Sequence, residues 1–226
     1  MTETRTLHGW LIPAAETHLD GYWENAQIWR DKRALYQPAQ QEAVRKAIAK
    51  LPTRARTIVD IGGHVGLWSF YLAPMCDRLI AFEPLEPHAD CYVQNMSELP
   101  LNWELNRCAL SDKAGTVFVQ WQEGNTGMSH VSVNDAGREI MSHTLDSFDL
   151  DDVDFIKLDV EGYELHVLRG ARETLLRNKP LILIEDKGHG AERYGERRLE
   201  AIDYVIDLGA KVKEKIVDDW LLEWVE

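Results

Sequence analysis

Short apolar runs alternate along this chain with longer stretches whose apolar residues recur every three or four positions. The runs span four to six residues and are rich in β-branched side chains, which is typical of strands buried in a parallel sheet. They are Thr57–Ile61, Asp77–Phe82, Val153–Leu158 and Leu181–Ile184. The periodic stretches predict helices over Pro38–Lys50, Pro87–Met96, Tyr163–Asn178 and Glu192–Leu208. This alternation predicts one doubly wound α/β domain with a mostly parallel sheet.

The remaining segments complete the expected organisation. Trp103–Leu105 and Gly115–Trp121 predict further strands with a loop over 106–112 between them, and 211–225 predicts a closing antiparallel hairpin. Gln122–Gly137 is rich in Gly, Asn and Ser and predicts an exposed hairpin or flexible lobe. Residues 1–35 show no period, so we expect an irregular extension that packs over an edge or covers a ligand cleft. We therefore expect an N-terminal extension over residues 1–37 and one domain over 38–226.

A glycine-rich turn follows the first of these strands. The run TIVDIGGHVGLWSFY, residues 57–71, carries Asp60 near the strand end and then Gly62, Gly63 and Gly66 before a predicted helix. Glycines here let the backbone approach a ligand, and the next helix offers free N–H groups and a positive dipole end. Because Asp60 stands before the first glycine, the Gly-x-Gly-x-x-Gly fingerprint of dinucleotide sites is absent. A carboxylate there suits a ligand with an ammonium group, or a site organised through bound water.

An acidic residue also follows the second strand. Glu83 lies 17 residues beyond Gly66 and precedes Pro84. At this position an acidic side chain can accept hydrogen bonds from both hydroxyls of a ribose. A lone glutamate would more often cap the helix that begins near Pro87, but the spacing from the glycine turn favours the ribose role.

Composition narrows the classes of partner. The 226 residues carry a formal net charge of −13, which predicts a soluble globular protein and argues against broad binding to nucleic acid or an anionic membrane. The sequence holds no run of about 18 apolar residues, and residues 1–13 lack the pattern of a secretory signal. Cys76, Cys91 and Cys108 have no metal-ligand spacing, so we expect reduced thiols and a cytoplasmic protein. The sequence does not predict the oligomeric state.

Several motifs taken together resemble one family. They are VDIGGHVGLWSFYLA, AFEP, NRCALSD, HTLDSF, DFIKLDVEGYELHVLRGA and PLILIE, between Thr57 and Gly209. Their order and spacing resemble those of the FkbM-type S-adenosylmethionine-dependent methyltransferases. The resemblance implies a class I methyltransferase (Rossmann-like) fold with a seven-stranded sheet, and methyl transfer that is usually directed to a hydroxyl oxygen. It does not cover the residues before Pro38, and Gly63–His64 stands where Ala–Asn is frequent.

The resemblance also implies which residues contact the cofactor. Asp60, Gly62 and Gly66 would hold the methionine part of S-adenosylmethionine, with Gly63 and His64 lining the same turn. Glu83 would hold the ribose. The residues implied to flank the adenine are Cys108, Ala109 and Leu110, of which Leu110 is equally well explained as a core residue.

Carboxylates at strand ends are the candidates for the chemical step, because ligands of open α/β sheets bind at the carboxyl ends of the strands. A hydroxyl acceptor reacts faster if it loses its proton during attack. Asp159 is the first choice for the base or acceptor-orienting group, with helix capping as its alternative, and Glu161 is the second. In a variant mechanism Asp159, Glu185 and Asp186 hold Mg²⁺, which lowers the pKa of the acceptor hydroxyl, although such acids also occur as plain surface residues.

The expected function is O-methylation of a hydroxyl on a small molecule or glycan, with no nucleic-acid or membrane partner. The alternative from another class is a non-catalytic S-adenosylmethionine-binding module, which would bind the cofactor tightly without turnover. A nicotinamide-dependent oxidoreductase is disfavoured because the dinucleotide fingerprint is absent. Neither residues 1–37 nor 122–137 match a pattern that identifies the acceptor.

Overall fold

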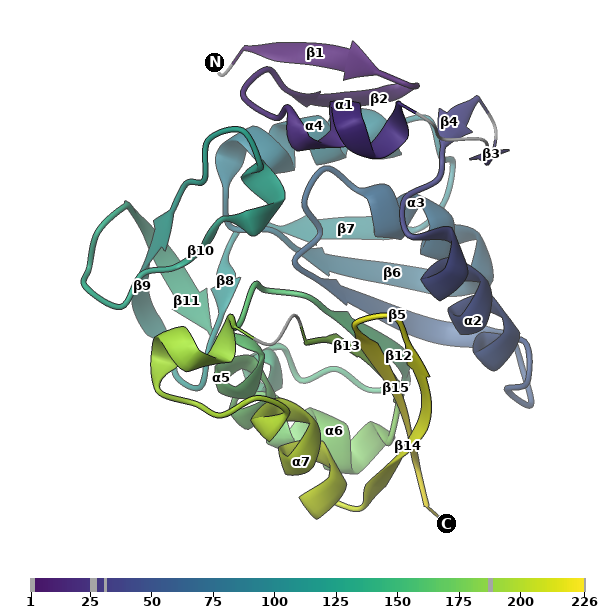
Figure 1. The fold of residues 1–226 in the computed structure, drawn as a ribbon. Helices are drawn as coiled ribbons and strands as arrows, with labels where there is room; N and C mark the ends of the chain where they lie inside the picture. Colours follow the sequence, from purple (N-terminus) through teal and green to yellow (C-terminus); the bar gives the residue numbers. More distant parts are fainter. Residues whose placement is uncertain (1–2, 25–27, 31, 187–188, 226) are drawn as a thin grey trace.

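The central feature of the computed structural model is a seven-stranded sheet (Figure 1). The structure describes residues 3–24, 28–30, 32–186 and 189–225. In spatial order the strands are β14 (Ala210–Ile216), β15 (Asp219–Trp224), β13 (Leu181–Glu185), β12 (Val153–Leu158), β5 (Ala55–Ile61), β6 (Cys76–Phe82) and β7 (Trp103–Asn106). Within this sheet β15 runs antiparallel to both neighbours, whereas the other pairings are parallel. The predicted fold class is confirmed, and the closing hairpin inserts β15 between β13 and β14.

Successive residues of each strand point to opposite faces of the sheet, and each face is covered by its own hydrophobic layer. On one face, α2 (Pro38–Ile48), α3 (Leu67–Leu72) and α4 (Glu86–Met96) pack against Ile58 and Leu79. On the other face, α5 (Glu164–Arg169), α6 (Arg172–Asn178) and α7 (Glu200–Asp207) pack against Val59 and Ile80. Each fully buried side chain of this kind contributes about 1.5–3 kcal/mol. The two layers therefore fix the sheet, and with it the strand ends at which ligands bind.

Two predicted helices are interrupted in the structure. The stretch predicted as one helix over 163–178 forms α5 and α6, which are separated at Gly170. A Cβ at Gly170 would lie 2.0 Å from the carbonyl oxygen of Ser111, so only glycine allows this close backbone approach at the point where the two helices separate. The stretch predicted over 192–208 begins as a 3₁₀ turn, η4 (Ala191–Tyr194), and becomes α-helical only in α7. Gly195 and Leu199 adopt φ values of +77° and +65°, which separate the two elements.

A second, smaller sheet lies beside the main one (Figure 1). Its strands, in spatial order, are β10 (His130–Val131), β9 (Gly115–Gln120), β11 (Arg138–His143) and β8 (Ala109–Leu110). The segment expected to be a loop over 106–112 thus contributes a strand. Residues 122–137 hold a 3₁₀ turn, η2 (Thr126–Met128), as well as β10. β10 pairs antiparallel with β9, so the segment forms part of a hairpin as predicted, and its residues are exposed or half-buried apart from the fully buried Thr126.

The N-terminal segment contains regular elements where an irregular extension was expected. β1 (Thr4–Leu7) and β2 (Trp10–Pro13) form an antiparallel hairpin, followed by α1 (His18–Trp23) and the short pair β3 (Trp29–Arg30) and β4 (Arg33–Ala34). Trp10 and Trp23 belong to a hydrophobic cluster that includes Val65 and Cys91, so the segment packs on α4 and the glycine turn. Among the described residues, no helix has the length and apolar character needed to cross a bilayer.

Candidate functional site

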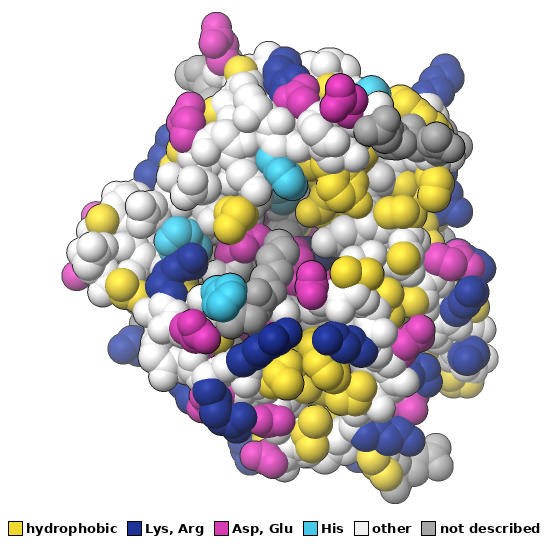
Figure 2. Space-filling view, viewed as in Figure 1, with side chains coloured by type: hydrophobic (Ala, Val, Ile, Leu, Met, Phe, Trp, Pro, Cys, Tyr) yellow, Lys and Arg dark blue, Asp and Glu magenta, His cyan; other side chains and the backbone are white. Residues whose placement is uncertain are grey.

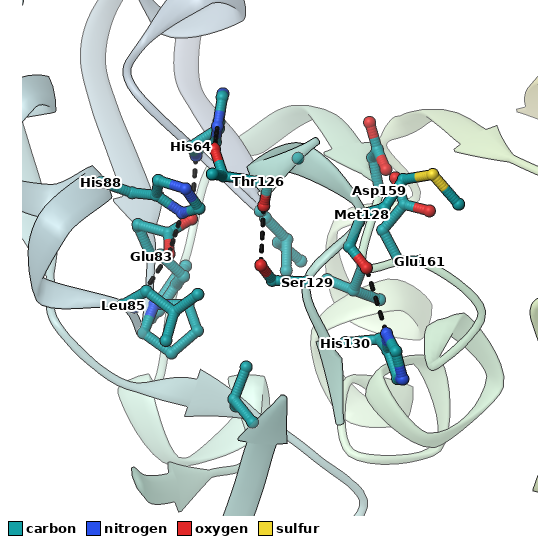
Figure 3. Close-up of a pocket in the computed structure, with 18 of the residues that line it drawn as sticks. His64, Glu83, Leu85, His88, Thr126, Met128, Ser129, His130, Asp159 and Glu161 are labelled. Atoms are coloured by element: carbon teal, nitrogen blue, oxygen red, sulfur yellow. Dashed lines mark hydrogen bonds and ion pairs between the residues drawn. The ribbon is translucent and has the colours of Figure 1, made fainter. Parts of the chain in front are cut away.

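A cavity of about 340 Å³ lies at the carboxyl ends of β5, β6 and β12 (Figure 3). The glycine turn and Glu83 line it from the main sheet, and Cys108 lines it from the start of the small sheet. Glu16 and Tyr36 line it from the N-terminal segment. Figure 2 shows acidic side chains and histidines gathered around the hollow on this face. The cavity therefore brings together residues that are far apart in the sequence, from Glu16 to Tyr163.

The glycine turn wraps closely around the neighbouring strand ends. The backbone N–H groups of Gly62 and Gly63 both donate to the carbonyl oxygen of Phe82, each at 3.0 Å. Gly62 has φ +83°, and a Cβ there would lie 1.9 Å from the carbonyl oxygen of Asp159. Only glycine fits this position, because both the backbone angle and the space exclude a side chain. Gly62 and Gly63 line the cavity, whereas Gly66 lies behind it as the residue that precedes α3.

A buried lysine joins two carboxylates beneath the turn. Lys157 on β12 is 4% exposed, and its Nζ lies 3.2 Å from Asp159 Oδ2 and 3.9 Å from Asp60 Oδ1. Burial alone would lower the pKa of Lys157, but the neighbouring carboxylates outweigh it and raise that pKa. Asp60 also accepts a 2.5 Å hydrogen bond from Ser69 Oγ, and it is fully buried. Asp60 therefore faces Lys157 and Ser69, whereas Asp159 lines the cavity.

Glu83 is buried at the end of β6, and three protein donors surround its carboxylate. Oε2 accepts from the His64 backbone N–H at 2.9 Å, and Oε1 accepts from the Leu85 backbone N–H at 2.8 Å. The Nδ1 atom of His88 lies 3.3 Å from Oε1. The bond to Leu85 orders the residue that precedes α4, and Glu83 also lines the cavity.

His64 connects the glycine turn to the small sheet. It has φ +47°, and its Nε2 lies 3.2 Å from Thr126 Oγ1 (Figure 3). Burial and the neighbouring His88 hold the pKa of His64 well below its usual range, so the ring is neutral at pH 7. A neutral imidazole in this position can accept or donate one hydrogen bond without adding charge to the cavity.

The three residues implied to flank the adenine lie together on one side of the cavity. Cys108, Ala109 and Leu110 are all buried and all line it. Burial raises the pKa of Cys108 to about 11, so this thiol stays protonated and acts as a small apolar surface. Leu110 also packs in the main hydrophobic cluster, which means that the core and cavity interpretations both apply to it.

Three carboxylates cluster where β12 and β13 end. Asp159, Glu161 and Glu185 each place an oxygen within 4.8 Å of the others. Asp186 does not join this group among the described residues, and its Oδ2 lies 3.7 Å from Arg198 Nε. The set expected to hold Mg²⁺ is thus corrected at one position, because Glu161 stands where Asp186 was expected. Successive strand residues point to opposite sides, so Glu185 and Asp186 cannot both face one site in an extended strand.

The loop that carries Asp159 and Glu161 is held by a buried glutamate. Oε1 of Glu164 accepts hydrogen bonds from the backbone N–H groups of Val160 at 3.1 Å and Gly162 at 3.0 Å. Glu161 adopts φ +58°, a conformation that needs such support in a residue other than glycine. Burial raises the pKa of Glu164 to about 7.

Exchanging Glu164 for glutamine is expected to change how stability depends on pH. The carboxyl of the folded chain titrates at about 7, whereas its ordinary value is 4.5. Because the pKa is higher in the folded state than in the unfolded state, the contribution of this carboxyl to stability is fully present below pH 4.5. That contribution is lost as the pH rises through 7. The free energy of unfolding of the wild type, relative to Glu164→Gln, should fall by on the order of 3 kcal/mol across this window. Denaturant titrations at several pH values measure the difference, and parallel curves for the two proteins would contradict it.

A second buried glutamate links the N-terminal segment to this site, and the sequence analysis missed it. Glu16 is 1% exposed, and its Oε2 accepts from the backbone N–H of Thr126 at 2.7 Å and from Thr126 Oγ1 at 2.8 Å. Its Oε1 accepts from the Leu19 backbone N–H at 3.1 Å. Thr126 in turn contacts His64, so one threonine joins three distant segments. The separation of 110 residues between Glu16 and Thr126 leaves no local pattern that could predict the contact.

The architecture and the site together define a class of protein. The main sheet places an antiparallel strand between two parallel ones, with a glycine turn after β5 and an acid after β6. This is the class I methyltransferase fold. Residues 60–212 match the Methyltransferase FkbM domain, and the chain belongs to the FkbM methyltransferase family. The family expected from the motifs is thereby confirmed, and S-adenosylmethionine is the cofactor that membership implies.

Comparison with individual proteins agrees with this assignment. Methyltransferase sdnD of Sordaria araneosa is 29% identical over 206 residues, covering 65% of this chain and 78% of the relative. The crystal structure of a methyltransferase FkbM from Methylobacillus flagellatus KT superposes with a TM-score of 0.56 at 19% identity, over 78% of this chain and 45% of that longer one. A ribosomal protein L11 methylase of Lactobacillus delbrueckii subsp. bulgaricus gives a TM-score of 0.50 at 9% identity, over 99% and 100%. The two structural likenesses establish the fold.

Proposed function

We propose that this protein is an S-adenosylmethionine-dependent O-methyltransferase that acts on a hydroxyl of a small molecule or glycan. The observation that carries the proposal is that the glycine turn, Glu83 and Asp159 line one cavity. Family membership supports the methyltransferase class, and the carboxylates at the cavity support a hydroxyl acceptor.

The cavity suits this cofactor in size and in the chemistry of its lining. Small-molecule pockets enclose roughly 300–1,000 Å³, and the cavity of about 340 Å³ falls within that range. Gly62 and Gly63 would hold the methionine part, and Glu83 would accept from the ribose. Cys108 and Ala109 would flank the adenine with small side chains. The bound cofactor supplies an activated methyl group on a sulfonium, so the protein's task is alignment, exclusion of water and proton removal.

The chain's own residues account for proton removal. Asp159 is held on a strand end by Lys157 and lines the cavity, so it is placed to accept the proton of an acceptor hydroxyl. Glu161 lies beside it and would orient the acceptor. Glu164 would position Asp159 and Glu161, because its carboxyl group holds the backbone of the loop that carries them.

The charge of the lining favours an uncharged or cationic acceptor. Among the described lining residues, Glu16, Glu83, Asp159 and Glu161 are acidic, and Lys157 is the one lysine or arginine. Lys157 is already paired with Asp159. A phosphate group would meet net negative charge here, which argues against nucleic acid as the acceptor.

The proposal is tested by cofactor binding and by turnover. Calorimetric titration with S-adenosylhomocysteine checks binding, and its release from S-adenosylmethionine over a panel of hydroxylated sugars and small molecules checks transfer. Tight binding without turnover on any acceptor would favour the non-catalytic module. Activity that disappears with a chelator and returns with Mg²⁺ would favour the metal-assisted variant at Asp159, Glu161 and Glu185. A preference for a nicotinamide cofactor would overturn the proposal.

Replacing Glu83 by alanine should weaken binding of S-adenosylhomocysteine by roughly 10–100-fold, since hydrogen bonds to a charged group contribute about 1.5–3 kcal/mol. The loss also includes the support that Glu83 gives to His64 and Leu85. Glu86→Ala is the matched control, because Glu86 is exposed at the start of the same helix and does not line the cavity. Equal affinities for the two variants would exclude Glu83 as a cofactor contact.

A further inference from the structure

The hydroxyl of Thr126 lies between a carboxylate and an imidazole, and this order fixes the direction of both hydrogen bonds (Figure 3). Glu16 accepts from the backbone N–H groups of Leu19 and Thr126, and its Oε2 also accepts from Thr126 Oγ1 at 2.8 Å. A hydroxyl has one proton, and the proton of Thr126 is used in this bond. The oxygen of Thr126 can therefore only accept from His64, whose Nε2 lies 3.2 Å away.

His64 consequently carries its proton on Nε2 and a lone pair on Nδ1. Burial and the neighbouring His88 hold the pKa of His64 well below its usual range, so the ring stays neutral and keeps this lone pair at pH 7. Nδ1 has no hydrogen-bond partner among the residues that the structure describes, yet it keeps accessible surface, in contrast to the closed Nε2 atom of His88. Because His64 lines the cavity, this nitrogen is an acceptor for a bound molecule.

The place of His64 in the cavity restricts which donor it can meet. Its backbone N–H donates to Glu83 Oε2 at 2.9 Å, and it directly follows Gly63 in the turn proposed to hold the methionine part of the cofactor. That part of the cofactor presents a carboxylate, which only accepts hydrogen bonds, and an ammonium group, which only donates them. A lone pair on a neutral imidazole repels the carboxylate and accepts from the ammonium group.

We propose that His64 Nδ1 accepts a hydrogen bond from the ammonium group of the cofactor, and that Glu16 is a positioning residue that sets the required tautomer through Thr126. This inference rests on the proposed function, because it assumes that S-adenosylmethionine occupies the cavity. Glu16 lies outside residues 60–212, which match the family's domain. The N-terminal segment would thus act on cofactor binding without touching the cofactor through Glu16.

The test compares S-adenosylhomocysteine with its deamino analogue, in which hydrogen replaces the amino group. By calorimetric titration the wild type should bind the analogue roughly 10–100-fold more weakly, because hydrogen bonds from a charged group are lost. His64→Leu should bind S-adenosylhomocysteine about tenfold more weakly, and its loss for the analogue should be smaller by about the same factor. A loss for the analogue of equal size in both proteins would overturn the inference.

Conservative variants separate the hydrogen bond from packing. His64→Asn places an amide oxygen near the position of Nδ1 and tolerates the φ of +47°, so it should keep most of the coupling. Thr126→Val removes the hydroxyl at nearly constant volume and should weaken the coupling, whereas Thr126→Ser should restore it. His143→Leu changes a half-buried histidine that does not line the cavity, and it should bind both compounds within about twofold of the wild type.

Nuclear magnetic resonance on the unmodified protein covers the case in which His64→Leu does not fold. The ¹⁵N signals of His64 should show a protonated Nε2 and an unprotonated Nδ1. S-adenosylhomocysteine should shift the Nδ1 signal, and the deamino analogue should leave it near its position in the free protein. A protonated Nδ1, or equal shifts with both compounds, would contradict the contact with the ammonium group.

The same signals test the role of Glu16. In Glu16→Ala the freed hydroxyl of Thr126 can donate to Nε2 of His64, so part of the protein should carry the proton on Nδ1 instead. An unchanged tautomer would exclude Glu16 as a positioning residue. If the wild type does not bind S-adenosylhomocysteine, the proposed function fails. If it binds and the cycle shows no coupling, only the role of His64 fails.

Discussion

Replacing Asp159 by asparagine is expected to lower kcat by about 10²–10³-fold while changing the affinity for S-adenosylhomocysteine by less than about threefold. A positioned general base contributes roughly 10²–10⁴-fold, and asparagine keeps the shape of the side chain but cannot take the proton. The cofactor affinity should survive, because the residues proposed to hold the adenosine end follow β6 or belong to the start of the small sheet, whereas Asp159 follows β12. Release of S-adenosylhomocysteine at saturating acceptor measures kcat, and calorimetry measures the affinity.

Two further variants give this prediction a control and an alternative. Asp186→Asn removes the carboxylate that directly follows β13, lies outside the cluster and is 3.7 Å from Arg198, and this variant should retain kcat within about twofold. Glu161→Gln should lower kcat less than Asp159→Asn and should raise KM more, because Glu161 is assigned to orienting the acceptor. A larger loss of kcat at Glu161 than at Asp159 would exchange the two roles.

The sequence predicts the main sheet because its signals are local. A strand buried on both faces must be apolar at nearly every position. Runs such as Leu181–Ile184 can therefore be identified as strands without knowing which strands lie beside them. The glycine turn is visible for the same reason, since Gly62 occupies a position that no other residue fits. The place of Glu83 at the cavity is predicted from its distance along the chain from the glycine turn. These elements fix where the cavity lies before any coordinate is known.

What the sequence does not predict depends on contacts between distant residues. The break between α5 and α6 lies at Gly170, which is visible in the sequence, but its close approach to the backbone of Ser111 is not. The pairing of Glu16 with Thr126 joins two segments that look irregular when each is considered alone. The choice of Glu161 over Asp186 in the carboxylate cluster depends on the sharp turn after β12, where Glu161 has φ +58°. Such features require the folded chain.

Removing the buried charge of Lys157 is expected to produce the largest loss of stability. Lys157→Met leaves the carboxylates of Asp60 and Asp159 without the ammonium that lies between them. Breaking a buried ion pair by removing one partner costs about 3–5 kcal/mol. For a domain of 226 residues this should lower Tm by roughly 10 °C. Thermal unfolding followed by circular dichroism measures the shift.

The comparison with other lysine and aspartate variants identifies the cause of that loss. Lys211→Met removes an exposed strand lysine that pairs with Glu223, and it should change stability by less than about 1 kcal/mol. Adding Asp60→Asn to Lys157→Met should recover part of the lost Tm, because it neutralises the carboxylate that is left fully buried. If the double variant were instead less stable by the sum of the two single losses, Asp60 and Lys157 would act independently.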